Sequence, residues 1–150
     1  MNKRIGVALI LASGLWAASP FAGTWKLDPA KTKYTAGAPP QDETLVIAAG
    51  SDDRAMITVT GTTASGRPIS IRYSVPDKGG AAQIEESPCD ALTMTRISEN
   101  VSDSVCSRGG KQIATRHTVI SEDGKTMRAT VDGIDPLGRR VSGVEVYEKQ

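Results

Sequence analysis

The chain has 150 residues, a formal net charge of +1, 39% hydrophobic residues and only 4% aromatic residues. This length fits one domain. The balanced charge excludes a broad basic surface for nucleic acid, and one His with two Cys cannot supply the usual ligands of a zinc site.

The first 22 residues have the pattern of a secretory signal peptide. Residues 2–4 are polar and basic, residues 5–18 form an apolar run, and small residues with a proline follow up to Ala22. The apolar run is shorter than the roughly 20 residues of a membrane span. We therefore expect cleavage after Ala22, a periplasmic or secreted location, and a mature domain at 23–150 without a stable membrane span.

From residue 45 onward, apolar residues recur at every second position, as in half-buried strands. The clearest run is Ile69, Ile71, Tyr73 and Val75, and shorter runs follow the same pattern: Leu45 with Ile47, Ile57 with Val59, Leu92 with Met94, Met127 with Ala129 and Val131, and Val144 with Val146. Turn-forming Gly, Asp, Ser and Asn residues separate these runs. Most turns are spaced as in hairpins, since a β-α-β crossover needs a longer connection.

The sequence therefore predicts an all-β domain. An antiparallel meander leaves two edge strands exposed, and closure into a barrel removes them. We expect an up-and-down β-barrel of eight to ten short strands. A two-sheet β-sandwich is the alternative.

The two cysteines, Cys89 and Cys106, are expected to form a disulfide. An exported chain with an even number of cysteines most simply pairs them. Neither lies in a Cys-x-x-Cys motif or beside a helix start, the settings that activate a thiol. A hairpin at residues 98–100 would also bring Cys106 close to Leu92, a few residues from Cys89.

Gly23-Thr24-Trp25 resembles the Gly-x-Trp start of lipocalin-type barrels. The longer segment 23–31, together with residues 123–126 and 144–147, resembles small exported bacterial lipocalin-like (calycin-type) β-barrel proteins. In such barrels the Trp closes one end and packs under an Arg of a late strand. The resemblance therefore implies a barrel-closing role for Trp25 with Arg139 or Arg140.

Four residues in the predicted strands are candidate ligand contacts: Tyr73, Arg96, Arg116 and His117. Alternate residues of a barrel strand face the interior, and a buried Arg must be paired or hold an anion. Arg96 shares a face with Leu92 and is expected inside. Arg116 and His117 point to opposite faces, and the sequence leaves open which of them faces inward.

Alternation places two further arginines, Arg72 and Arg128, on the outer face. The lipocalin-type resemblance implies that an inward Arg grips a ligand carboxylate.

No catalytic pattern is present. His117 is the only His, and the Gly-x-Ser-x-Gly motif is absent. The acidic segments 51–53 and 132–135 lack EF-hand spacing and fit tight turns. We expect no enzyme, no cofactor and no metal.

The predicted function is that of an exported lipocalin-like protein that binds a small apolar or amphipathic ligand in its barrel. The alternative is a protein-interaction or inhibitor barrel without a small-molecule cavity. Its partner would contact the acidic loop 85–90, which Pro88 and the disulfide would stiffen.

Overall fold

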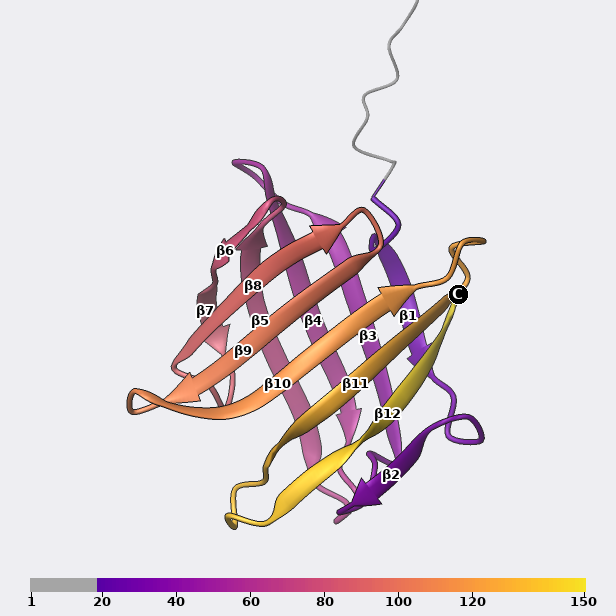
Figure 1. The fold of residues 1–150 in the computed structure, drawn as a ribbon, viewed down its shortest axis with the longest axis vertical. Coiled ribbons are helices and arrows are strands. Elements are labelled where there is room, and N and C mark those ends of the chain that lie inside the picture. The colour runs from indigo at the N-terminus through magenta and orange to yellow at the C-terminus, as the bar shows by residue number, and fades with distance from the viewer. Residues whose placement is uncertain (1–18) are drawn as a thin grey trace, which may run out of the picture.

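The computed structural model describes residues 19–150, and every regular element there is a β-strand (Figure 1). Most of the predicted signal peptide, residues 1–18, lies outside the described residues. The strands are β1 (Gly23–Leu27), β2 (Lys33–Ala36), β3 (Asp42–Ala49), β4 (Arg54–Thr62), β5 (Pro68–Pro76), β6 (Gly79–Ala81), β7 (Gln83–Glu86), β8 (Ala91–Ser98), β9 (Val101–Arg108), β10 (Lys111–Ile120), β11 (Thr126–Ile134) and β12 (Arg140–Lys149).

The strands form one antiparallel sheet that curls into a nearly closed barrel (Figure 1). Its order is β6-β8-β9-β10-β11-β12-β1-β3-β4-β5-β7, with β2 attached to β12. The first strand lies beside the last, because β1 pairs with β12. At the other seam β6 pairs with β8, and β7 pairs with β5. The up-and-down barrel is therefore correct, and the single sheet excludes the sandwich.

The predicted count of eight to ten strands is wrong, since the described residues form twelve. Two strand breaks account for the difference. A turn at 28–32 separates β1 from β2, although both pair with β12. The segment 79–86 changes partner at Ala82, whose N–H donates to the Leu92 carbonyl. The glycine-rich start of this segment shows no apolar alternation, so the sequence pattern did not predict the break between β6 and β7.

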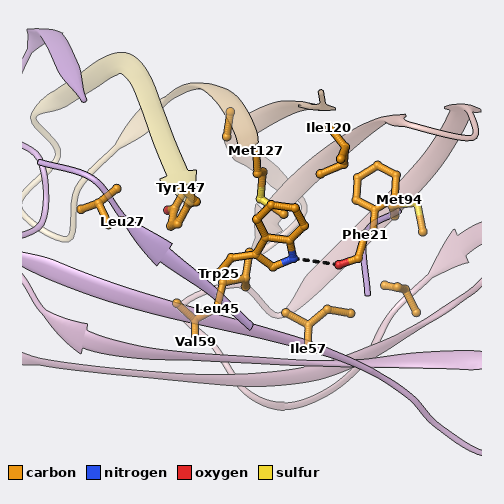
Figure 2. Close-up of a cluster of buried hydrophobic side chains, with 12 residues drawn as sticks. Phe21, Trp25, Leu27, Leu45, Ile57, Val59, Met94, Ile120, Met127 and Tyr147 are labelled. Atoms are coloured by element: carbon orange, nitrogen blue, oxygen red, sulfur yellow. Dashed lines mark hydrogen bonds between the residues drawn. The ribbon is translucent and has the colours of Figure 1, made fainter. Parts of the chain in front are cut away.

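A cluster of apolar side chains fills one end of the barrel (Figure 2). Trp25 is fully buried at its centre, and its Nε1 donates a hydrogen bond to the Phe21 carbonyl at 2.9 Å. The strand register aligns Trp25 with Leu45 and Leu45 with Val59, so these side chains share the inner face. Alternation thus identified the core of β3 and β4 correctly.

Phe21 belongs to this core, although it precedes the expected cleavage point after Ala22. Its side chain is only 7% exposed, and the Arg96 guanidinium lies 4.4 Å from the centre of its ring. Cleavage after Ala22 would remove both the ring and the carbonyl that Trp25 uses. Burial of a Phe side chain contributes about 1.5–3 kcal/mol, so this loss would weaken the closed end.

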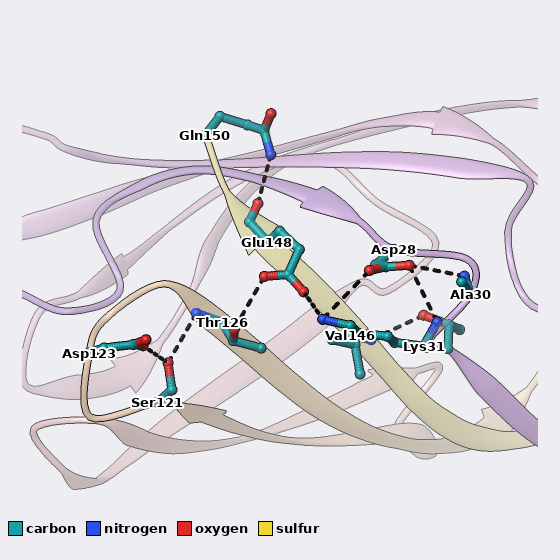
Figure 3. A network of polar contacts seen from close by, with 10 residues as sticks. Asp28, Ala30, Lys31, Ser121, Asp123, Thr126, Val146, Glu148 and Gln150 are labelled. Atoms are coloured by element: carbon teal, nitrogen blue, oxygen red, sulfur yellow. Dashed lines mark hydrogen bonds and ion pairs between the residues drawn. The ribbon is translucent and has the colours of Figure 1, made fainter.

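The turn between β1 and β2 is fixed to β12 by polar contacts (Figure 3). The Asp28 N–H donates to the Val146 carbonyl at 2.8 Å, and the Thr32 hydroxyl accepts a hydrogen bond from the Val146 N–H at 3.1 Å. Lys31 forms an ion pair with Glu148 at 2.9 Å. These contacts redirect the chain, so that β2 continues along β12 toward the opposite end of the barrel.

The predicted disulfide between Cys89 and Cys106 is present, with a Cα–Cα distance of 5.6 Å. The expected register is also confirmed, since Leu92 lies opposite Cys106. Both cysteines line the barrel interior. The bridge therefore ties the loop that follows β7 to the inner wall of β9.

Removing this bridge with Cys89→Ser and Cys106→Ser together should lower the free energy of unfolding by about 3 kcal/mol. The bridge closes a loop with a sequence separation of 17 residues, and loops of that size give roughly this value in the chain-entropy model. Urea unfolding of the oxidised protein and the double variant would measure the difference. Equal unfolding midpoints with equal slopes would contradict a stabilising role for the bridge.

Candidate functional site

A cavity of about 430 Å³ lies inside the barrel, next to the core cluster. Most of its wall is apolar and comes from alternate residues of β3, β4, β5 and β11, among them Leu45, Val59, Ile71, Val75 and Val131. Loop residues 87–89 and the start of the turn after β11 line it as well. The volume lies within the range of small-molecule sites.

Four polar residues that line the cavity, Tyr34, Glu43, Arg116 and Glu145, form a hydrogen-bonded cluster with the buried Tyr147, and we call these five side chains the Arg116 cluster. Arg116 Nη1 lies 3.0 Å from Glu145 Oε2, and the Tyr34 hydroxyl donates to Glu145 Oε1 at 2.6 Å. The Tyr147 hydroxyl lies 2.6 Å from Glu43 Oε1 and 2.5 Å from Glu145 Oε2. The Arg116 guanidinium also lies 5.6 Å from the centre of the Tyr147 ring.

The hydrogen bonds of the Arg116 cluster determine where its protons lie. Glu145 accepts from Arg116 and Tyr34, which suits an ionised carboxylate. Tyr147 has one hydroxyl proton and contacts two carboxyl groups, so these two groups compete for it. Glu43 is the carboxyl that holds a proton more readily, because Glu145 already accepts hydrogen bonds from Arg116 and Tyr34.

The electrostatic environment supports this assignment. Burial raises the pKa of Glu43, and the nearby charge of Glu145 raises it further. Burial also opposes ionisation of Glu145, but the Arg116 charge and the hydrogen bonds from Tyr147 and Tyr34 outweigh it and lower the pKa of Glu145. The two carboxyl groups are therefore pushed apart, with Glu43 the easier to protonate and Glu145 the easier to ionise.

Tyr34 reaches this cluster because β2 crosses β12 at a glycine. Tyr34 pairs with Gly143, and a Cβ at Gly143 would clash with the Tyr34 ring and lie 2.7 Å from the Lys33 carbonyl oxygen. Glu145 thus accepts hydrogen bonds from three side chains: Tyr34 on β2, Arg116 on β10 and Tyr147 on β12.

Three of the four candidate ligand contacts line the cavity: Tyr73, Arg96 and Arg116. Arg96 lies beside Phe21 of the core cluster, and its Nη2 donates a hydrogen bond to the Asp77 carbonyl at 3.1 Å. His117 lies on the outer face, where its side chain is 51% exposed and contacts Asp103. The open question of register is thus answered: Arg116 faces inward and His117 outward.

Four further arginines lie on the outside of the barrel: Arg72, Arg128, Arg139 and Arg140. Arg72 and Arg128 are exposed, as alternation predicted. Arg139 and Arg140 do not pack on Trp25. Both side chains are 71% exposed and form ion pairs with Asp135 and Asp132 at the β11–β12 turn. The cation over Trp25 is instead Lys149, whose Nζ lies 5.3 Å from the ring centre.

Sequence reasoning missed Tyr34, Glu43, Glu145 and Tyr147. It grouped Val144 with Val146 as one apolar face of the last strand. The register pairs Ala129 with Glu145 and Met127 with Tyr147, so Glu145 and Tyr147 share the inner face with the core of β11. A usable signal was present, because Tyr147 and Glu145 alternate with the two valines. To use this signal, we would have had to place the carboxylate of Glu145 inside the barrel.

The loop proposed as a protein-contact surface folds against the cavity. Ser87, Pro88 and Cys89 line it, and Arg108 Nε donates to the Pro88 carbonyl at 2.9 Å. Asp90 accepts a hydrogen bond from the Gly109 N–H at 2.8 Å. The disulfide and these contacts hold residues 87–90 at the end of the barrel.

The pH dependence of stability should reveal the raised pKa of Glu43. A carboxyl whose pKa is raised on folding favours the native state at low pH, and this contribution is lost as pH rises through the folded pKa. As pH rises above about 4, the ordinary pKa of a Glu side chain, the free energy of unfolding of the native protein should therefore fall relative to that of Glu43→Gln. Urea unfolding at several pH values would test this. A constant difference would show that Glu43 does not change its protonation on folding.

Within residues 19–150, no helix is long and apolar enough to cross a membrane. The same residues contain no group of three or more His, Cys, Asp or Glu side chains arranged to hold a metal ion.

No family model matches the chain, and no curated protein matches its sequence. Solved structures do match its fold. The fluorescent protein UnaG aligns with a TM-score of 0.52 and 14% identity, over 87% of this chain and 97% of UnaG. The protein Rv2717c from M. tuberculosis aligns with a TM-score of 0.52 and 17% identity, over 93% of this chain and 99% of Rv2717c. At such identities the likeness establishes the fold alone, which is an antiparallel, nearly closed β-barrel.

Proposed function

We propose that this protein binds a small apolar or amphipathic molecule inside its barrel. The supporting observation is the cavity of about 430 Å³, whose wall is mostly apolar and includes four residues of the Arg116 cluster: Tyr34, Glu43, Arg116 and Glu145. Apolar walls with a few well-placed polar groups are typical of small-molecule sites, in which the wall gives affinity and the polar groups fix orientation. Enzymatic activity, a cofactor and a resident metal are not part of the proposal.

The alternative, an inhibitor barrel that contacts its partner through loop 85–90, is less well supported. Such a protein needs a protruding loop and no interior cavity. Here residues 87–89 form part of the cavity wall, where Arg108 and the disulfide hold them. A loop in this position suits a rim that limits access to the cavity.

We further propose that the protein acts outside the cytoplasm, as the N-terminal pattern and the disulfide suggest. The burial of Phe21 favours cleavage before Phe21 rather than after Ala22. The intact mass of the protein exported by a bacterial host should then include Phe21 and be two hydrogens lower than that of the reduced chain. A mature chain that begins at Gly23 would show that the barrel folds without Phe21.

Ligand binding can be tested with one pair of variants on β5. Ile71 lines the cavity, whereas the next residue, Arg72, is exposed on the outer wall. Ile71→Trp should fill the cavity, and Arg72→Trp adds the same side chain outside. Fluorescence titration with N-phenylnaphthylamine, a neutral apolar probe, should show binding to the native protein and to Arg72→Trp.

The Ile71→Trp variant should bind this probe at least about tenfold more weakly, which corresponds to roughly 1.4 kcal/mol. Circular dichroism and urea unfolding would verify that both variants fold. Equal binding by both variants would place the probe outside the cavity and contradict the proposal.

A further inference from the structure

The Arg116 cluster fixes the chemical class of the ligand's polar group. Among the residues that line the cavity, six are ionisable as acids or guanidinium groups: Glu43, Arg96, Arg108, Arg116, Asp132 and Glu145. Asp132 pairs with Arg140 at the turn after β11, and Arg108 binds the Pro88 carbonyl at the rim. Arg96 lies against the ring of Phe21, in the core cluster. The carboxyl and guanidinium groups beside the centre of the cavity are therefore Glu43, Arg116 and Glu145.

Arg116 is already neutralised before any ligand binds. Its Nη1 contacts Glu145 at 3.0 Å, and the Glu145 side chain is only 6% exposed. Glu43 lies on the other side of Tyr147, which bridges the two carboxyl groups. An incoming carboxylate would thus meet two carboxyl groups for one guanidinium, and a buried charge without a partner costs several kcal/mol.

Arg116 still offers hydrogen-bond donors to the cavity. A guanidinium has five N–H groups, and among the described residues Glu145 is its hydrogen-bond acceptor, through Nη1. The side chain is 30% exposed although it lies on the inner face, and it lines the cavity. Its register neighbour Ser104 and nearby Thr118 add neutral hydroxyl groups to the same wall.

We propose that the cavity selects a ligand with an uncharged hydrogen-bonding head, such as a hydroxyl, carbonyl or amide, and discriminates against a carboxylate. The head accepts a hydrogen bond from Arg116 without adding charge to the cluster, and the apolar part lies along β3, β4 and β5. This inference rests on the proposed function, because it concerns the same cavity. It differs from the expectation drawn from the lipocalin-type resemblance, in which an inward Arg grips a ligand carboxylate.

Three molecules with the same alkyl chain and different heads provide the test: decanol, decanoate and decylamine. Each is titrated against the native protein loaded with N-phenylnaphthylamine at neutral pH, and its displacement constant is measured. Decanol should displace the probe at least about tenfold more effectively than decanoate, as expected for one unpaired charge beside the cluster. Decylamine should also be weaker than decanol, because its charge would lie beside Arg116.

Variants of the Arg116 cluster then test whether this cluster causes the discrimination against decanoate. In the double variant Glu43→Gln with Glu145→Gln, Arg116 has no carboxylate partner, and decanoate should gain at least about tenfold relative to decanol. Glu85→Gln removes a charge from the exposed outer wall, where Glu85 lies 3.6 Å from Arg72, and should leave the ranking unchanged. If the double variant does not fold, the ranking by the native protein remains the deciding measurement.

Different results would overturn the neutral-head inference and the proposed function. Displacement by decanoate or decylamine as strong as that by decanol would overturn the neutral-head inference and leave ligand binding intact. If neither the probe nor any of the three molecules binds the native protein, the proposed function fails, and the inference fails with it.

Discussion

Arg116→Met should lower the free energy of unfolding by about 3–5 kcal/mol, the usual cost of removing one partner of a buried ion pair. The loss arises because the Glu145 side chain, only 6% exposed, would keep its charge without a counter-charge or would have to take up a proton. Met fills much of the same space, so the effect is electrostatic rather than a packing defect. Urea unfolding at neutral pH measures the difference.

A second variant separates the two causes. Arg116→Met combined with Glu145→Gln removes both charges and leaves Tyr34 and Tyr147 with a neutral partner. This double variant should recover most of the lost stability, since replacing a whole buried pair is often close to neutral. If the double variant is as unstable as Arg116→Met alone, the guanidinium acts through packing, and the assignment of charges within the Arg116 cluster is wrong.

Trp25→Ala should also lower the free energy of unfolding by about 3–5 kcal/mol, as large-to-small substitutions of buried aromatic residues do. Trp25 is fully buried in the core cluster, which also contains Leu45, Met127 and Tyr147 (Figure 2). Its removal would leave a void that these side chains fill only in part. It would also leave the buried Phe21 carbonyl without the hydrogen bond from Nε1.

Trp25→Phe is the matched control, because it keeps an aromatic ring but loses the N–H donor. It should cost clearly less than Trp25→Ala, about 1–3 kcal/mol for an unsatisfied buried acceptor and a smaller ring. Thermal or urea unfolding of both variants would rank them. Equal losses would show that the hydrogen bond, and not the volume of the indole ring, determines the contribution of Trp25.

Alternation along the strands predicted the inner face wherever the apolar residues were unambiguous. Ile71 and Tyr73 line the cavity, Arg72 is exposed, and Met127 and Ala129 are buried, as expected. These assignments succeed because successive side chains of a strand point to opposite faces. The disulfide followed from cysteine parity.

The same rule failed on β12 for a physical reason. Val144 and Val146 lie on one face and Glu145 and Tyr147 on the other, and both faces of this strand contain large side chains. Glu145 is buried because Arg116, Tyr34 and Tyr147 surround it, and these partners come from three different strands. A period-two pattern contains no information on partners as distant in sequence as Tyr34 and Arg116.

Local alternation, turn composition and residue counts were sufficient to predict the all-β class, the antiparallel connections, most inward positions and the pairing of Cys89 with Cys106. The twelve strands, the inward direction of Arg116, the position of Lys149 over Trp25 and the contacts within the Arg116 cluster became known from the three-dimensional structure. Those features depend on strand register and on contacts between distant segments. A shift of one residue in register would exchange Arg116 for His117 in the cavity wall.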